Sequence, residues 1–542
     1  MCGIFAFLGR SKNLHLLLAY FDRIQHRGPD KTHIDQINDR VVFGFHRLAI
    51  NGLTLSGDQP MTRGNVVLIC NGEIYNHREL AKRFGFSMSS TSDCEIVLHL
   101  YALLGFEDTI KRLEGEFAMV LYDQNTDIMY AGRDRFGVRG LMYGPVQSGE
   151  FAFASEAIAL SGLTSTINHF PPSCWWSSEH PGVFETYFRL PPLLPSGHHF
   201  ANYENAVSRI RVLLERAVEC RLLMTERPAC CLLSGGLDST VVSHLVAKIN
   251  RAKCGDDRRI NAYTIGLVGS DTRHAQGDLY YATIAADEFA MNHHRIYLVE
   301  KQVIDSVPIV VKTTGSPDVT TNRASIFNYN VCQEIKKIGG NSPDRDVVVF
   351  SAEFSDEIFN SYKGAMRAPD AEAFYRENRR MTDECHLYDF VRGDRCISSA
   401  SLEARLPFTD TELVKFVMSL PPEFKMFREH GKEKMLLRDA FKGCISDVLL
   451  YRPKEAFSDA TGSKSRPPYV ILQEHADKLY TDEEFAAKSS GYKHLPPKTK
   501  EALWYREIFE QWYPGQAETL LKRYWQHAFA SSASEDPSAR TI

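Results

Sequence analysis

The 542-residue sequence lacks several features that mark particular classes of protein. No uninterrupted apolar run reaches the roughly 18 residues needed to cross a bilayer, and the first residues lack the charged and apolar regions of a signal peptide. A net charge of -5 leaves no excess of positive charge for a nucleic-acid partner. We therefore expect a cytoplasmic protein that binds neither nucleic acid nor membrane.

Paired Cys-x-x-Cys sets, which hold zinc, are also missing, although the chain has 12 cysteines. Cys2 nevertheless differs from the others, because removal of Met1 would expose a residue with both a thiol and a free α-amine. An α-amine with a pKa of about 7.7–8.0 can take the proton of a thiol whose pKa is about 8.5. Cys2 is therefore a candidate nucleophile for acyl transfer that needs no histidine.

The length predicts more than one domain. Short β-rich runs separated by turns fill the first part of the chain and predict stacked antiparallel sheets, up to a proline-rich segment at 188–196. After this segment, helical and β patterns alternate, as in a parallel α/β sheet. We predict a first domain at 2–190, a linker at 191–204, a second domain at 205–530 and a disordered tail at 531–542.

The strongest single motif runs from Ser234 to Thr240 and follows the apolar run at 229–233. Its two glycines let a ligand approach backbone N–H groups at a helix start, where the helix dipole favours anions. Asp238 adds a carboxylate of the kind that binds Mg²⁺ together with phosphate oxygens. The Gly-Lys-Ser/Thr ending of a Walker loop is absent, so the sequence predicts a different kind of phosphate-binding loop.

A family resemblance is carried by ten motifs between residue 1 and about residue 512. Five motifs resemble the glutaminase domain of class II amidotransferases: Met1-Cys-Gly-Ile, His26-Arg-Gly-Pro-Asp30, His46-Arg-Leu48, Asn71-Gly-Glu-Ile-Tyr-Asn76 and Arg133-Asp-Arg-Phe-Gly137. Five others resemble the synthetase domain of glutamine-dependent asparagine synthetases: Ser234-Gly-Gly-Leu-Asp-Ser239, Asp318-Val-Thr-Thr-Asn-Arg-Ala-Ser325, Leu402-Glu-Ala-Arg405, Lys454-Glu-Ala-Phe-Ser-Asp459 and Tyr505-Arg-Glu-Ile-Phe-Glu510.

The resemblance implies a two-domain fold. The first domain is expected to be an antiparallel β-sheet sandwich flanked by helices, of the N-terminal-nucleophile (Ntn) hydrolase type. The second is expected to be a parallel α/β sheet of the ATP-pyrophosphatase (PP-loop) type. The implied substrates are glutamine, aspartate and ATP, with Mg²⁺ as cofactor, and ammonia passes between two sites through a tunnel. Dimers occur in this family, so a homodimer is one expected arrangement.

The resemblance also assigns roles in the glutaminase site. Cys2 would attack the side-chain amide of glutamine, while Asn71 and the Gly72 N–H would form the oxyanion hole. Arg47 would bind the α-carboxylate of glutamine and Asp93 its α-ammonium. The expected glutamine-binding residues are Arg47, Asn71, Glu73 and Asp93.

In the synthetase site, aspartate would attack the α-phosphate of ATP and give β-aspartyl-AMP, which ammonia converts to asparagine. The expected magnesium ligands are Asp238 and Asp356. The expected catalytic residues are Lys454 for the phosphates, Thr320 and Arg323 around the intermediate, and Glu353 for the attack of ammonia. The expected ATP-binding residues are Leu232, Ser234, Gly235, Gly236, Asp238, Ser239, Ile265, Ser351 and Ala352.

The loop after Ser351 departs from the family pattern. Four family glycines are replaced, by Ala352, Phe354, Asn360 and Ser361. If Phe354 has a positive φ, the backbone holds strain of about 1–3 kcal/mol, and the ring could crowd ligand space. Because the ionic residues of the loop are retained, we interpret the change as altered geometry with the chemistry kept.

Three alternatives stay open at this point. A β-lactam-type synthetase shares the architecture but generally lacks a working glutaminase site. Other amidotransferases join this nucleophile to sugar-phosphate or phosphoribosyl domains, which the Ser234 loop does not fit. A non-catalytic sensor or scaffold, in which the altered loop has ended turnover, is the third.

Overall fold

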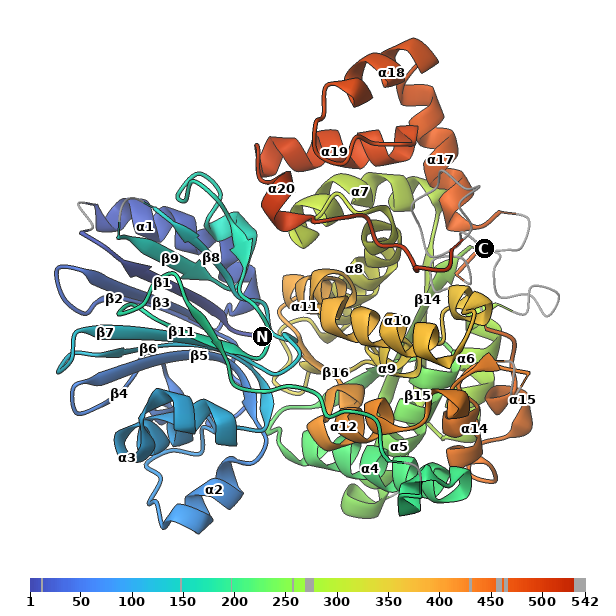
Figure 1. Ribbon diagram of the computed structural model, residues 1–542, viewed down its shortest axis with the longest axis horizontal. Helices are drawn as coiled ribbons and strands as arrows, with labels where there is room; N and C mark the ends of the chain where they lie inside the picture. Colours follow the sequence, from blue (N-terminus) through green and yellow to red (C-terminus); the bar gives the residue numbers. More distant parts are fainter. Residues whose placement is uncertain are drawn as a thin grey trace.

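The computed structural model describes residues 1–10, 13–146, 149–195, 197–255, 258–268, 277–427, 431–454, 461–462 and 466–530. Two antiparallel sheets form a sandwich in the N-terminal half, and a parallel sheet lies in the C-terminal half (Figure 1). This is the two-domain fold class expected from the sequence. The tail expected at 531–542 lies outside the described residues.

The first sheet of the sandwich has the strand order β10-β8-β9-β1-β3-β2 and the second has the order β12-β11-β7-β6-β5-β4. The strands of the first sheet are β1 (Gly3–Leu8), β2 (Lys31–Gln36), β3 (Val41–Arg47), β8 (Met142–Pro145), β9 (Phe151–Ala154) and β10 (Asn168–His169). Those of the second are β4 (Met61–Arg63), β5 (Val66–Ile74), β6 (Gly115–Asp123), β7 (Ile128–Arg133), β11 (Cys174–Ser177) and β12 (Phe184–Thr186). Helices α1 (Leu14–Phe21), α2 (His77–Phe84) and α3 (Glu95–Arg112) flank the sandwich (Figure 1).

Strand β1 shows how the sequence pattern positions the sandwich. Side chains alternate between the two faces of a strand. Ile4 therefore points into the core between the sheets, together with Ala6 and Leu8. Phe5 points the other way, into a larger apolar cluster that continues into the C-terminal half. Because both faces of β1 are buried, this strand is fixed in place directly after Cys2.

The parallel sheet has the strand order β15-β14-β13-β16-β17, and helices lie on both sides of it (Figure 1). Its strands are β13 (Ala229–Leu232), β14 (Asn261–Leu267), β15 (Asn292–Leu298), β16 (Val348–Phe350) and β17 (Glu403–Arg405). The helices are α4 (Tyr203–Leu223), α5 (Leu237–Cys254), α6 (Asp278–Glu288), α7 (Glu300–Thr314), α8 (Val319–Gly339), α9 (Ser355–Phe359), α10 (Ala371–Glu384), α11 (Asp389–Ser399), α12 (Thr411–Ser419), α14 (Met435–Phe441), α15 (Asp447–Leu450), α17 (Pro468–Leu479), α18 (Asp482–Ser490), α19 (Lys500–Trp512) and α20 (Ala517–Leu520). Within the described residues, no helix is long and apolar enough to span a bilayer.

Buried charges join the two halves. The guanidinium of Arg27 donates to Asp394 on α11, with an Nη1–Oδ2 distance of 2.9 Å. Arg405 on β17 forms an ion pair with Glu73 at the end of β5, with an Nη2–Oε1 distance of 2.8 Å. Strand β17 is the edge strand nearest the sandwich, and the Arg405 carbonyl accepts from the Ser351 N–H at 3.1 Å. One residue therefore contacts both the Asn71 segment and the Ser351 loop.

Candidate active sites

Cys2 immediately precedes the buried strand β1. Its Sγ lies 3.4 Å from the Leu48 nitrogen and 3.6 Å from the Leu48 carbonyl oxygen. Burial raises the pKa of the thiol to about 11 while Met1 is attached. Met1 is fully buried as well, and its amine donates to the Leu402 carbonyl at 2.8 Å. In the chain that keeps Met1, the nitrogen of Cys2 is a peptide nitrogen and cannot act as the base.

Asn71 and Gly72 lie near the end of β5. Asn71 is fully buried, and neither its Oδ1 nor its Nδ2 has a hydrogen-bond partner among the described residues. An unpaired buried amide typically costs about 1–3 kcal/mol, so this side chain is available for a ligand. Gly72 has a φ of +148°, and a Cβ there would lie 2.1 Å from the Glu116 carbonyl oxygen. These features fit the predicted oxyanion hole, which stays a prediction.

The other residues predicted to bind glutamine have partners within the protein. Arg47 donates to the carboxylate of Asp58, and its Nη1 lies 3.1 Å from the Thr54 carbonyl oxygen. Asp93 accepts from the Ile74 N–H at 2.6 Å, and burial raises the pKa of its carboxyl group. Glu73 is paired with Arg405, as described above. Their predicted roles remain predictions, and Arg47 would have to change partner to bind a carboxylate.

The glycine-rich loop leads from β13 into α5. Gly235 has a φ of +73°, and a Cβ there would lie 2.5 Å from the Ala282 nitrogen, so the close packing of loop against α6 requires glycine. The hydroxyl oxygens of Ser234 and Ser239 are 2.9 Å apart. A pocket of about 780 Å³ opens beside the loop. The predicted residues that line it are Leu232, Ser234, Gly236, Asp238, Ser239, Ile265, Ser351, Ala352, Glu353 and Asp356.

Two carboxylates of this pocket converge on one position. The Nζ of Lys434 lies 2.5 Å from Asp238 and 2.6 Å from Asp356. Lys454 also donates to Asp356. Although burial raises the pKa of this carboxyl, the ammonium groups of Lys434 and Lys454 hold it well below its usual range. Lys454 lines a neighbouring pocket rather than the one beside the loop. Residues 455–459, the rest of its motif, lie outside the described residues.

Four residues predicted for the synthetase site do not line the pocket: Gly235 and Lys454, described above, and Thr320 and Arg323. Thr320 and Arg323 lie on α8. The buried Arg323 pairs with Glu501 on α19, and their Nη2 and Oε2 atoms are 2.6 Å apart. That Thr320 and Arg323 act around the reaction intermediate therefore stays a prediction.

At two of the four positions where a family glycine is replaced, the new residue has a positive φ. Phe354 has a φ of +79° and Asn360 a φ of +48°, both in the left-handed region that costs a side chain about 1–3 kcal/mol. The Phe354 ring is fully buried between Phe136 and Phe390, with centroid distances of 5.3 and 4.9 Å. The ring also lines the pocket. Phe354 therefore contacts both halves of the chain and the ligand space.

The sequence motifs missed several residues of these two pockets. Lys434 lines the neighbouring pocket and lies outside the motifs, although the nearby basic residues and the helix that follows offered a weak signal. The missed residues that line the pocket beside the loop include Asn328, Glu357, Tyr362, Asp389 and Arg392. Glu357 and Tyr362 were visible as neighbours of Asp356, whereas Asn328 and Arg392 come from helices distant in the sequence.

A cysteine directly before an antiparallel sandwich and a glycine-rich loop on a parallel sheet are the arrangement expected of a glutamine amidotransferase joined to a nucleotide-dependent synthetase. Residues 1–177 match the family described as a glutamine amidotransferase domain, and residues 209–376 and 366–535 match the asparagine synthase family. The chain belongs to the family of glutamine-hydrolysing asparagine synthetases.

Full-length relatives agree with this assignment. A probable glutamine-hydrolysing asparagine synthetase from Acanthamoeba polyphaga mimivirus is 35% identical, and the match covers 100% of both chains. The glutamine-hydrolysing asparagine synthetases of Mus musculus and Homo sapiens are each 34% identical, over 100% of this chain and 98% of theirs.

Proposed function

We propose that this protein makes asparagine from aspartate in an ATP-dependent reaction, with ammonia released from glutamine, and forms glutamate, AMP and pyrophosphate. The observation that carries the proposal is the combination of two sites in one chain. The unpartnered amide of Asn71 lies in the motif that follows Cys2 in the family pattern, and the pocket at the Ser234 loop holds Glu353 and Asp356.

In the glutaminase site, the thiol of Cys2 attacks the side-chain amide carbon of glutamine after Met1 has been removed. The free α-amine of Cys2 takes the thiol proton and passes it to the leaving ammonia. The Asn71 amide and the Gly72 N–H stabilise the oxyanion, and each such donor typically contributes about 2.7–4 kcal/mol. Water then hydrolyses the thioester and releases glutamate.

In the synthetase site, the β-carboxylate of aspartate attacks the α-phosphorus of ATP, and pyrophosphate leaves. The loop from Ser234 to Ser239 binds the phosphates through backbone N–H and hydroxyl groups. Lys434 and Lys454 neutralise the charge that develops on pyrophosphate. Ammonia then attacks the acyl carbon of β-aspartyl-AMP, the acyl–oxygen bond breaks so that AMP leaves, and Glu353 accepts the excess proton of the attacking nitrogen.

The carboxylates of Asp238 and Asp356 fit a divalent cation, because both approach one position that Lys434 reaches. Mg²⁺ takes carboxylate and phosphate oxygens as ligands. Bound there, it would neutralise phosphate charge and orient ATP. We include Mg²⁺, a cytoplasmic location and a homodimer in the proposal.

The test supplies the purified protein with Mg-ATP and aspartate, with either glutamine or ammonium as nitrogen donor, and measures asparagine and pyrophosphate. We expect asparagine from both donors, and Cys2→Ala should stop only the glutamine route. Cys254→Ala is the matched control, because this thiol is exposed at the end of α5. Mass spectrometry of the N-terminus should show that Met1 is absent. Wild-type protein that forms no asparagine from either donor would contradict the proposal.

A further inference from the structure

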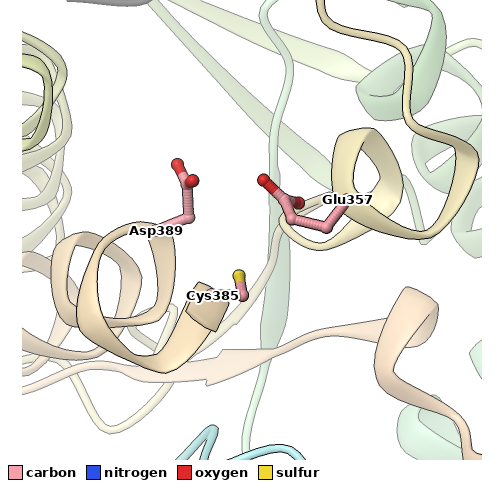
Figure 2. Close-up of side chains that lie close together, drawn as sticks. All are labelled: Glu357, Cys385 and Asp389. Carbon is pink, nitrogen blue, oxygen red and sulfur yellow. The ribbon is translucent and has the colours of Figure 1, made fainter. Parts of the chain in front are cut away.

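Asp58 is a carboxylate in the glutaminase half that the reaction described above does not use. The carboxylates of Glu357 and Asp389, which Figure 2 shows together with Cys385, line the synthetase pocket already described. Asp58 lies elsewhere, directly after a short 3₁₀ turn at Leu55–Gly57 on the loop between β3 and β4. One of its contacts is the residue expected to bind glutamine, so this carboxylate lies beside the proposed glutamine site.

Two basic side chains hold the carboxylate of Asp58, one on each oxygen. The Nη1 of Arg47, at the end of β3, donates to Oδ1. The Nζ of Lys31, at the start of β2, donates to Oδ2. Although burial raises the pKa of the Asp58 carboxyl, the hydrogen bond from Lys31 and the charge of Arg47 hold this pKa below its usual value. Asp58 is therefore an anion with two cationic partners.

Arg47 already has one partner of the same chemistry as its expected ligand. Its guanidinium also donates to the carbonyl oxygens of Thr54 and Gly52, at 3.1 Å from Nη1 and 2.5 Å from Nη2. Among the described residues that Arg47 contacts in this way, Asp58 offers the carboxylate. A carboxylate forms a stronger, charge-assisted hydrogen bond with a guanidinium than a carbonyl does. The α-carboxylate of glutamine would therefore compete directly with Asp58.

The surroundings allow Arg47 and Asp58 to separate at a modest cost. Lys31 can stay on Oδ2 when Oδ1 loses Arg47, and the side chain of Asp58 is 16% exposed, so water can reach it. Residues 53–56, which lead to Asp58, are exposed as well, so this part of the loop can shift without disturbing the core. The separation therefore leaves no buried charge without a partner, which would be the costly outcome.

We propose that Asp58 competes with glutamine for Arg47 and thereby lowers the affinity of this chain for its nitrogen donor. Glutamine binds when its α-carboxylate takes the place of the Asp58 carboxylate on Arg47, and Lys31 then holds Asp58 alone. Asp58 therefore sets the glutamine concentration at which ammonia is supplied to the synthetase site. The inference rests on the proposed function, because it assumes that Arg47 binds glutamine.

A carboxylate that only holds Arg47 in position for glutamine would have the opposite effect. Removal of a positioning carboxylate weakens the binding of glutamine, whereas removal of a competitor strengthens it. Two backbone carbonyl oxygens, those of Thr54 and Gly52, already orient the guanidinium. Arg47 therefore does not need Asp58 for its orientation, and the competing role is favoured.

The experiment measures kcat and KM for glutamine hydrolysis, from the release of glutamate, in the wild type and in Asp58→Asn. The amide keeps the size of the side chain and removes its charge. We expect KM to fall about 3- to 10-fold and kcat to stay the same, because the competition acts on binding and not on the chemical step. Ammonium-dependent synthesis of asparagine, which does not use Arg47, reports in every variant that the chain is folded.

Two controls separate competition from a general effect of charge. Asp35→Asn removes the same charge from an exposed position on β2 and should keep the wild-type KM, because an exposed charge is screened. γ-Aminobutyramide has the amide and the ammonium group of glutamine but lacks the α-carboxylate. Its inhibition constant should therefore be the same in the wild type and in Asp58→Asn.

Lys31→Met should change KM in the opposite direction. Without Lys31, Asp58 depends on Arg47 alone, so glutamine should displace it less easily and KM should rise about 3-fold. In the double variant Lys31→Met/Asp58→Asn this rise should disappear, because no carboxylate is left to compete. A rise that persists in the double variant would mean that Lys31 attracts glutamine directly, which would overturn the proposed exchange of partners.

An unchanged or higher KM in Asp58→Asn would overturn the inference, and so would an equal fall of KM in Asp35→Asn. Wild-type protein that does not hydrolyse glutamine would instead contradict the proposed function. An Arg47→Ala protein that keeps the wild-type KM would contradict it too, because Arg47 would then not bind glutamine. The two failures are therefore distinguishable.

Discussion

Each of the two active sites contains a residue with a positive φ, but only one of these residues is glycine. Gly72 in the glutaminase half and Phe354 in the synthetase half both have positive φ angles, of +148° and +79°. A Cβ at Gly72 would lie 2.1 Å from a backbone carbonyl oxygen, whereas the Phe354 side chain fits between Phe136 and Phe390. A strained φ therefore does not by itself require glycine. The absence of space for a side chain does.

The variant Gly72→Ala tests this comparison with the largest expected effect. The Cβ would meet the Glu116 carbonyl, and the Gly72 N–H would have to move. Loss of one oxyanion donor typically costs about 2.7–4 kcal/mol, so we expect glutamine-dependent asparagine synthesis to fall about 100- to 1,000-fold. Ammonium-dependent synthesis should stay near the wild-type rate. Steady-state assays with the two nitrogen donors measure both effects.

Gly64→Ala is the control for backbone strain alone. Gly64 has a φ of +59°, and apart from its two chain neighbours no described residue has an atom within 4 Å of the position of its Cβ. This variant should lose about 1 kcal/mol of stability and keep both activities. A Gly72→Ala protein that hydrolyses glutamine at the wild-type rate would show that the Gly72 N–H does not bind the oxyanion.

Phe354→Gly tests the other half of the comparison. Glycine would relieve about 1–3 kcal/mol of backbone strain but remove a buried ring, which typically costs about 3–5 kcal/mol. We expect a net loss of about 2 kcal/mol in the free energy of unfolding, measured by denaturant titration. Phe136→Ala keeps the strained backbone and removes one ring contact, so it should also destabilise the protein. A Phe354→Gly protein more stable than the wild type would mean that strain outweighs packing.

The sequence predicted the elements that local patterns encode. Short β-rich runs separated by turn signals predicted strands such as β1 and β6, and glycine with hydroxyl residues predicted the loop after β13. The residues that tertiary packing brings together were harder to predict. Asn328 reaches the pocket beside the Ser234 loop, and Lys434 reaches the neighbouring pocket. Their placement depends on how α8 and α11 pack and on the loop before α14, which local sequence patterns do not encode.

The last prediction concerns the pH dependence of stability at His46, on strand β3 beside Cys2. His46 stacks on Phe21, with a centroid distance of 3.7 Å, and burial lowers its pKa to about 4. Its Nδ1 lies 2.8 Å from the Thr32 hydroxyl and its Nε2 lies 3.2 Å from the Phe21 carbonyl, an arrangement that suits the neutral ring.

At pH values between the folded pKa of about 4 and the unfolded pKa of about 6.5, the unfolded chain binds more protons at His46 than the folded chain does. The stability that neutral His46 contributes is therefore complete above about pH 6.5 and falls as the pH falls. The loss at pH 5 should be about 2 kcal/mol. Denaturant unfolding of the wild type and His46→Gln at pH 7.5 and pH 5 measures it. We expect the difference in unfolding free energy between the two pH values to be smaller in the variant. An identical pH dependence in both proteins would show that His46 is not held neutral by burial in the β3 strand.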